Sequence, residues 1–344
     1  MFDQIAGNQR VKELLRRTLE SRRVPGALLF SGEEGIGKKL FALEIAKALN
    51  CRSPLGVEAC DVCSSCARIS KLNYPQSDDS DDWKDIIWTD HTDVGMVVAP
   101  KRVLLVNQMR QIEREANYRP FEGKARVFLI EDADKFNDQS ANALLKVLEE
   151  PPPTSHLILI TSRPAMLLPT VRSRCQMIRF SPLTVNEIEQ YLLQTKTASR
   201  AQARLRARLA HGSIGRALES DIESFKRQRD GMFKVIEALA SDDRALLLLS
   251  SEELNSGGQK DDYESSLDIL ETLIRDTLML SLGVQDHQIV NDDLRSQLAK
   301  VAESINAGTA ANWIAKIEEL REQLVVNINR KIATDALLLS MASG

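Results

Sequence analysis

A loop that contains three glycines and two lysines, Gly32–Lys39, carries the clearest chemical pattern of this sequence. Backbone N–H groups of such a loop, a lysine and the N-terminus of a following helix together bind phosphate groups. The pattern G-x-x-x-x-G-K-[ST] is met at Gly32, Gly37 and Lys38, and Gly35 adds a further glycine amide. Lys39 stands where the pattern needs a Ser or Thr hydroxyl for Mg²⁺, and a second ammonium group repels a cation. The sequence therefore predicts a phosphate loop that is degenerate at its metal-binding position.

Two acidic residues, Glu131 and Asp132, follow the apolar stretch Val127–Ile130. This pattern predicts a buried parallel strand that brings carboxylates to its C-terminal edge, where nucleotide hydrolases hold Mg²⁺ and orient the attacking water. The usual order is Asp then Glu, so the second carboxylate here is one methylene shorter. A displacement of about 1 Å at a reacting centre can cost about a hundredfold in rate. Thr161 directly follows the next apolar strand, His156–Ile160, and we expect it beside the same site.

Four cysteines lie close together in the sequence and form the pattern C-x8-C-x2-C-x2-C. Two-residue gaps let neighbouring thiolates face one ion, and four thiolates complete a closed tetrahedral zinc site of the structural kind. The alternatives are disulfide bonds or a redox C-x-x-C pair, but a chain without a secretory signal favours metal. The predicted ligands are Cys51, Cys60, Cys63 and Cys66.

The elements that must position these residues alternate between strands and helices, which predicts an α/β fold with a parallel sheet. The apolar run Ala27–Phe30 reads as a buried strand before the glycine loop, and Leu40–Leu49 as the helix after it. Upstream, Asn8 is expected to cap a helix with an apolar face. From Ser181 onward the pattern is helical, with apolar stripes such as Leu267, Leu270 and Ile274 that predict a helical bundle.

Length, composition and charge restrict the class of protein further. The chain has 344 residues, 43% of them hydrophobic and 27% charged, which is typical of a globular protein with more than one domain. A net charge of −4 argues against a strong free-standing nucleic-acid binder. The sequence shows neither a secretory signal nor an apolar stretch of about 20 residues that could span a membrane. We therefore expect a cytoplasmic protein.

We expect three domains. Residues 1–180 would form the sheet domain with the cysteine module at 51–66, residues 181–220 a small lid of three short helices, and residues 221–344 an all-helical domain.

Several motifs together resemble those of one family. They are the loop Gly32–Lys39, the four cysteines, the segment Asn142–Pro152, and Ser173-Arg174-Cys175. On these residues the chain is identified as similar to the clamp-loader subunits of bacterial DNA polymerase III, within the AAA+ superfamily. The resemblance is specific over about residues 1–220 and weaker beyond, where it implies a collar domain that oligomerises. It also places Arg216 in the sensor 2 segment and Thr161 or Ser162 at sensor 1.

Within this family, Lys39 and the order Glu131-Asp132 favour the delta-prime type of subunit over the ATP-hydrolysing gamma/tau motor. The resemblance then implies that Arg174 is an arginine finger that acts in trans on a neighbour's ATP site. Productive Mg-ATP binding by this chain is not expected, and Cys175 is expected to be a packed residue rather than a nucleophile. The implied partners are the gamma/tau and delta subunits and, through the complex, the beta sliding clamp and primer-template DNA.

Two other functions stay open at this point. A gamma/tau-type motor would hydrolyse ATP rapidly by itself, and a stand-alone zinc-dependent nucleic-acid-binding protein would bind DNA tightly and in a salt-sensitive way. The acidic net charge argues against the second of these.

Overall fold

The computed structural model of the chain describes residues 1–75, 83–241, 246–247, 260–283, 289–324 and 330–342. The chain divides into two compact units, Met1–Glu219 and Ser220–Gly344. Each unit has its own hydrophobic core and is described by itself.

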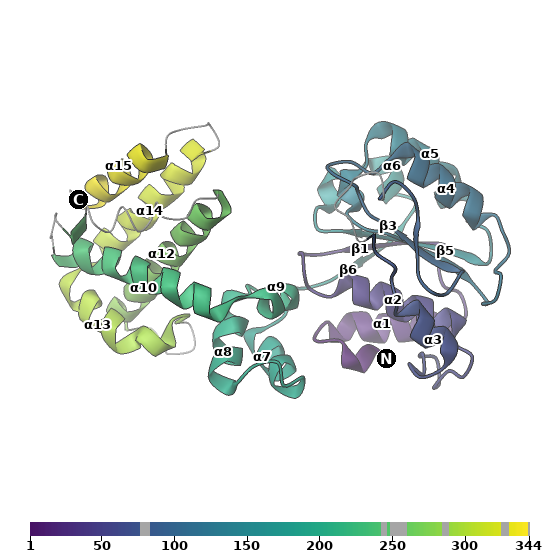
Figure 1. Cartoon of the computed structure of the whole chain (residues 1–344), viewed down its shortest axis with the longest axis horizontal. Helices are drawn as coiled ribbons and strands as arrows, with labels where there is room; N and C mark the ends of the chain where they lie inside the picture. Colours follow the sequence, from purple (N-terminus) through teal and green to yellow (C-terminus); the bar gives the residue numbers. More distant parts are fainter. Residues whose placement is uncertain (76–82, 242–245, 248–259, 284–288, 325–329, 343–344) are drawn as a thin grey trace. The chain divides into compact units, whose positions relative to one another are not determined.

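The first unit is built around a six-stranded sheet with the order β2-β3-β4-β5-β1-β6 (Figure 1). All neighbouring strands are parallel except the pair β2 and β3 at one edge, which is antiparallel. In the parallel pairing of β1 with β5, Leu29 lies opposite Leu159. This confirms the predicted α/β class with a mostly parallel sheet. The strands are β1 (Ala27–Ser31), β2 (Ile87–Trp88), β3 (Val94–Val97), β4 (Arg126–Ile130), β5 (Ser155–Thr161) and β6 (Gln176–Arg179).

Helices cover both faces of this sheet (Figure 1). Alternate residues of β1 point to opposite faces, so Leu28 and Phe30 join the core with Phe41, whereas Leu29 joins the core with Met109. Because both faces are covered, β1, β4 and β5 are buried along their whole length. The helices are α1 (Gln9–Glu20), α2 (Lys38–Asn50) and α3 (Ser64–Ile69) on one face, and α4 (Val106–Ala116), α5 (Asp138–Glu149) and α6 (Pro169–Arg172) on the other.

Three short helices complete the first unit, as expected from the sequence: α7 (Val185–Gln194), α8 (Arg200–Leu209) and α9 (Ile214–Glu219). Capping boxes at Thr184 and Ser199 satisfy the free N–H groups at the starts of α7 and α8.

The described part of the second unit is helical, and the predicted apolar stripes face its core, including Leu267, Leu270 and Ile274. Polar groups are also buried here. The Asp276 carboxylate accepts hydrogen bonds from the N–H groups of Val290 at 2.9 Å and Asn291 at 2.7 Å. The helices are α10 (Ile222–Ser241), α12 (Lys260–Ser281), α13 (Arg295–Ser304), α14 (Ala307–Leu324) and α15 (Arg330–Ala342).

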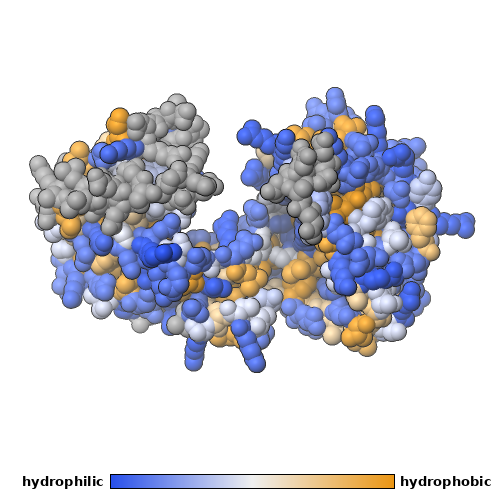
Figure 2. Space-filling model, viewed as in Figure 1, coloured by the Kyte–Doolittle hydropathy of each residue, from blue (hydrophilic) through white to orange (hydrophobic). Residues whose placement is uncertain are grey.

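Hydrophilic residues cover most of the described surface on the face seen in Figure 2, and apolar residues are interspersed among them. Among the helices of the described residues, none is both long and apolar enough to cross a membrane.

Candidate functional site

The glycine loop joins β1 to α2, as the sequence predicted, and places α2 with its N-terminus at the loop. Gly35 has a φ of +72°, and a Cβ atom there would lie 2.2 Å from the Ser213 hydroxyl oxygen. The carbonyl of Gly35 also accepts a hydrogen bond of 2.9 Å from the N–H of Gly215, at the start of α9. The loop is therefore packed directly against the start of α9, and this contact admits no side chain at position 35.

Lys38 turns its ammonium group back onto the loop. Its Nζ donates hydrogen bonds to the carbonyl oxygens of Gly32, at 2.7 Å, and Glu33. The side chain is buried, and this burial lowers the pKa of Lys38 despite the attraction of nearby carboxylates, Glu34 first among them. The lysine thus closes the loop upon itself.

Lys39 forms an ion pair with Glu131, the first acid after β4, with 2.9 Å between Nζ and Oε1. The same ammonium lies 5.0 Å from the centre of the Tyr74 ring. Burial would lower the pKa of Lys39, but the charge of Glu131 and a hydrogen bond with Tyr74 raise it. A positive charge therefore stands beside the carboxylate that a Mg²⁺ ion would need. The residues present do not fit a Mg²⁺ site.

Most of the other residues predicted from the sequence lie around a cavity that the glycine loop helps to line. Asp132 has a left-handed backbone with a φ of 49°, and its carboxylate pairs with Lys135 at 2.8 Å. The Thr161 hydroxyl donates a hydrogen bond of 2.6 Å to Asp134, and Arg216 of α9 is exposed. The cavity has a volume of about 660 Å³, and Gly32 is not among its lining residues. The residues predicted from the sequence that do line the cavity are Gly35, Gly37, Lys38, Lys39, Glu131, Asp132, Thr161 and Arg216.

Arg174 lies outside this cavity, just after α6. Its guanidinium donates hydrogen bonds to Glu149 from Nε at 2.7 Å and from Nη2, and to the Thr170 carbonyl from Nη1 at 2.9 Å. The adjacent Cys175 packs against the apolar core, and burial raises the pKa of its thiol to about 12. A thiol that stays protonated is a poor nucleophile, as expected for this residue.

The four predicted metal ligands come together at the end of α2 and the start of α3, with all four sulfur atoms within 4.8 Å of one another. Cys51 lies 3.5 Å from Cys60 and 3.9 Å from Cys63, and Cys63 lies 3.5 Å from Cys66. A tetrahedral ion with metal–sulfur bonds of about 2.3 Å separates its sulfur ligands by about 3.8 Å. The cluster therefore has the dimensions of a four-thiolate metal site.

Backbone N–H groups also point at these sulfur atoms. The N–H of Cys60 donates to the sulfur of Cys51 at 3.4 Å, and that of Cys63 to the sulfur of Cys60 at 3.3 Å. Burial by itself would raise the pKa of Cys63, but hydrogen bonds from the backbone and from the other cysteines lower it to about 6. The surroundings of Cys63 thus favour the thiolate form that binds a metal ion, whereas burial raises the pKa of Cys51 and of Cys66.

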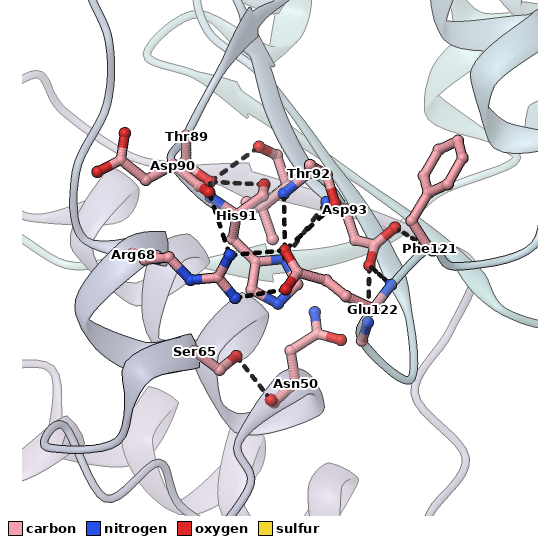
Figure 3. A network of polar contacts seen from close by, with 12 residues as sticks. Asn50, Ser65, Arg68, Thr89, Asp90, His91, Thr92, Asp93, Phe121 and Glu122 are labelled. Carbon is pink, nitrogen blue, oxygen red and sulfur yellow. Dashed lines mark hydrogen bonds and ion pairs between the residues drawn. The ribbon is translucent and has the colours of Figure 1, made fainter.

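A polar network that the sequence did not reveal joins the cysteine module to the sheet domain (Figure 3). Arg68 of α3 forms an ion pair with Glu122, which lowers the pKa of this carboxyl to about 2. The buried Asp93 accepts hydrogen bonds from the N–H groups of Phe121 at 2.8 Å and Glu122 at 3.0 Å. Ser65 of α3 donates a hydrogen bond of 2.8 Å to the carbonyl of Asn50. The module is thus tied to the loop before β4.

The parallel sheet, the glycine loop between β1 and α2 and the acids after β4 define the phosphate-loop class of α/β nucleotide-binding folds. Two family models match the chain: DNA polymerase III, delta subunit, over residues 7–184, and its C-terminal counterpart over residues 223–342. The chain belongs to this DNA polymerase III delta-subunit family.

Individual relatives agree with this family. The chain is 29% identical to the DNA polymerase III subunit delta' of Bacillus subtilis over 97% of its own length and 96% of that protein. It is 28% identical to the Escherichia coli subunit delta' over 95% of its length and 92% of that protein. The Escherichia coli subunit tau is 32% identical, but the match covers 63% of this chain and 32% of tau. The matches to delta' subunits therefore span nearly all of both chains, whereas the gamma/tau subunit of Mycobacterium tuberculosis matches 99% of this chain but 61% of its own length.

Proposed function

We propose that this chain is a clamp-loader subunit of DNA polymerase III of the delta-prime type, which hydrolyses no ATP itself and supplies Arg174 to the ATP site of a neighbouring subunit. The family membership and the two full-length matches to delta' subunits support the assignment to this complex.

The observation that carries the non-hydrolysing part is the ion pair between Lys39 and Glu131. ATP hydrolysis in this class of fold needs Mg²⁺, which bridges the β- and γ-phosphates and is held by a loop hydroxyl and a carboxylate. In this chain the hydroxyl is replaced by an ammonium group, and the carboxylate neutralises that group. The shorter Asp132 then stands where an acid would orient the attacking water. Each of these two differences removes a group that ATP hydrolysis needs.

The position of Arg174 supports a role in trans. The side chain is 31% exposed and is not part of the cavity of its own subunit. A guanidinium group is permanently charged and binds phosphate oxygens with paired N–H donors. An arginine that reaches a neighbour's γ-phosphate stabilises the charge of the transition state, typically by a factor of about 10³ to 10⁵.

The four cysteines are proposed to hold a structural zinc ion. When bound, this ion would supply a cross-link between α2 and the start of α3, with all four ligand positions filled by protein. The module would then be a rigid part of the fold, tied to the sheet domain by Arg68 and Ser65.

The proposed partners follow from the complex. They are the gamma/tau and delta subunits, with the beta sliding clamp and primer-template DNA reached through the assembly. The second unit, whose described residues are mostly helical, would serve as the collar that joins the subunits, and the chain would work in the cytoplasm, where the DNA is copied.

The test is ATP hydrolysis by the complex reconstituted with gamma/tau, delta, clamp and primed DNA, with Arg174→Ala in this chain. We expect a large fall in the DNA-stimulated rate, because one ATP site loses its charge-stabilising group. Arg172→Ala is the matched control, since Arg172 is an exposed arginine of the same segment. An unchanged rate with Arg174→Ala would refute the proposed role.

A second measurement separates this proposal from the ATPase motor. The isolated chain is expected to show no ATP turnover above the level of a Lys38→Ala variant. Rapid turnover that Lys38→Ala abolishes would identify a motor subunit instead.

A further inference from the structure

The guanidinium of Arg174 is held by a side chain from a different element of the fold. Glu149 is the last residue of α5, and its Oε1 accepts hydrogen bonds from both Nε, at 2.7 Å, and Nη2 of Arg174. The Thr170 carbonyl accepts from Nη1 at 2.9 Å, and the Ser173 hydroxyl lies 3.5 Å from the same nitrogen. The arginine is thus fixed from two sides.

The position of Glu149 is unusual for a carboxylate. The C-terminal end of a helix carries partial negative charge, so an acidic residue in the last turn is destabilising unless a cation lies nearby. Glu149 stands in the last turn of α5, and the cation that it contacts is Arg174. Because its side chain is 49% exposed, the ion pair itself adds little to the stability of the fold. A role in holding the arginine explains the carboxylate better than a role in stability.

The contacts also leave the arginine able to bind a further group. A guanidinium has five N–H donors. Glu149 occupies the edge formed by Nε and one N–H of Nη2, and Thr170 takes an N–H of Nη1. The second N–H of Nη2 still points away from this edge. The arginine therefore has a defined direction and retains a donor for an oxygen atom of a ligand.

We propose that Glu149 is a positioning residue for Arg174, which orients the guanidinium toward the ATP site of the neighbouring subunit. This inference rests on the proposed function of Arg174. A long arginine side chain loses much rotamer freedom when it is fixed. The ion pair with Glu149 already restricts the arginine side chain before the subunits meet. Less rotamer freedom is then lost when the arginine enters the neighbour's site, because the side chain is already oriented.

The test uses the complete complex and four forms of this chain: wild type, Glu149→Ala, Arg174→Ala and the double variant. In the wild-type background we expect Glu149→Ala to lower kcat for DNA-stimulated ATP hydrolysis about tenfold, with little change in the KM for ATP, since misplacement of a catalytic group acts on the transition state. In the Arg174→Ala background the same substitution should have no further effect, because Glu149 acts only through the arginine.

Glu149→Gln keeps the size of the side chain and an oxygen acceptor, and we expect it to retain more activity than Glu149→Ala. It also keeps the test valid if the alanine variant folds poorly. Glu150→Ala is the matched control, because Glu150 is the adjacent exposed glutamate. Size-exclusion chromatography verifies that each variant enters the complex.

The outcomes separate this inference from the proposed function. An unchanged rate with Arg174→Ala would refute the arginine finger itself. A fall with Arg174→Ala but not with Glu149→Ala would overturn the positioning role alone. The positioning role would also be wrong if Glu149→Ala lowered the rate equally in both backgrounds, since Glu149 would then act without Arg174.

Discussion

Replacement of Lys39 by threonine tests the central argument about the phosphate loop, because it restores G-x-x-x-x-G-K-T and releases Glu131. The separation of 2.9 Å between Nζ and Oε1 corresponds to an attraction of about 6 kcal/mol at an effective dielectric constant of about 20. The Lys39 side chain is 33% exposed, so screening by water reduces the net value to about 1–2 kcal/mol. Mg²⁺ must overcome this energy in the wild-type chain. We therefore expect Lys39→Thr to bind Mg-nucleotide about 5- to 30-fold more tightly.

The assay is titration of the isolated chain with a fluorescent ATP analogue, with Mg²⁺ and with EDTA. The gain should require Mg²⁺, and Lys39→Arg, which keeps the positive charge, should resemble the wild type. ATP turnover should remain absent in Lys39→Thr, because Asp132 is still too short. Equal affinity of Lys39→Thr and the wild type in the presence of Mg²⁺ would refute the argument that the ammonium excludes the ion.

Three further predictions concern stability. Cys60→Ser removes one ligand of the proposed zinc site, so it should lower the zinc content, measured by a colorimetric chelator, and lower the Tm by about 5 °C; an unchanged zinc content would contradict the four-thiolate site. Burial lowers the pKa of His156 below its usual 6.5. As the pH falls below that value the unfolded chain therefore binds the proton first, and the free energy of unfolding should fall as the pH is lowered from about 7 to about 5. Urea unfolding should show this fall to be smaller in His156→Gln, and an equal fall would contradict the assignment. Asp276→Ala leaves the N–H groups of Val290 and Asn291 without their acceptor, so it should destabilise the second unit by about 3 kcal/mol in the same assay; a loss under about 0.5 kcal/mol would show that other groups replace the carboxylate.

The sequence predicted the sheet domain well, because buried parallel strands leave an uninterrupted apolar pattern. The expected strand Val127–Ile130 corresponds to β4, and His156–Ile160 to β5, each extended by one or two residues. Strand β2 was harder to predict, because it has only two residues and lies at the edge of the sheet, where antiparallel pairing with β3 needs no long apolar run.

The prediction that the Asn8 side chain caps α1 was wrong for a physical reason. Asn8 has the right side chain to cap α1, but it adopts a left-handed backbone with a φ of 53° and makes no capping hydrogen bond. Its amide group instead exchanges hydrogen bonds with the backbone of Ser181, at 2.8 Å and 3.1 Å. A partner 173 residues away in the chain leaves no local signal, and it outweighs the local preference of the residue.

The residues of the candidate site also divide into those that the sequence predicts and those that only the structure reveals. Spacing within one loop or one strand identified Lys38, Lys39 and Glu131, because these residues belong to short motifs. Tyr74 and Glu149 were missed, since each meets its partner across the fold and neither has a spacing that predicts the contact. Motifs reveal residues that act from one element, whereas residues that support them from another element need the structure.

The contact between the glycine loop and the start of α9 affects how phosphate-loop motifs are interpreted in other sequences. A Cβ atom at Gly35 would strike Ser213, and the carbonyl of Gly35 binds the N–H of Gly215. These constraints apply whether or not a nucleotide is ever present. Gly35 can thus be kept by selection for folding alone, and so can the motif residue Gly32, because a Cβ atom there would lie 2.7 Å from the carbonyl oxygen of Phe180. Such glycines alone are therefore weak evidence for ATP hydrolysis, and the residue after the motif lysine, which would contact Mg²⁺, is the more informative position.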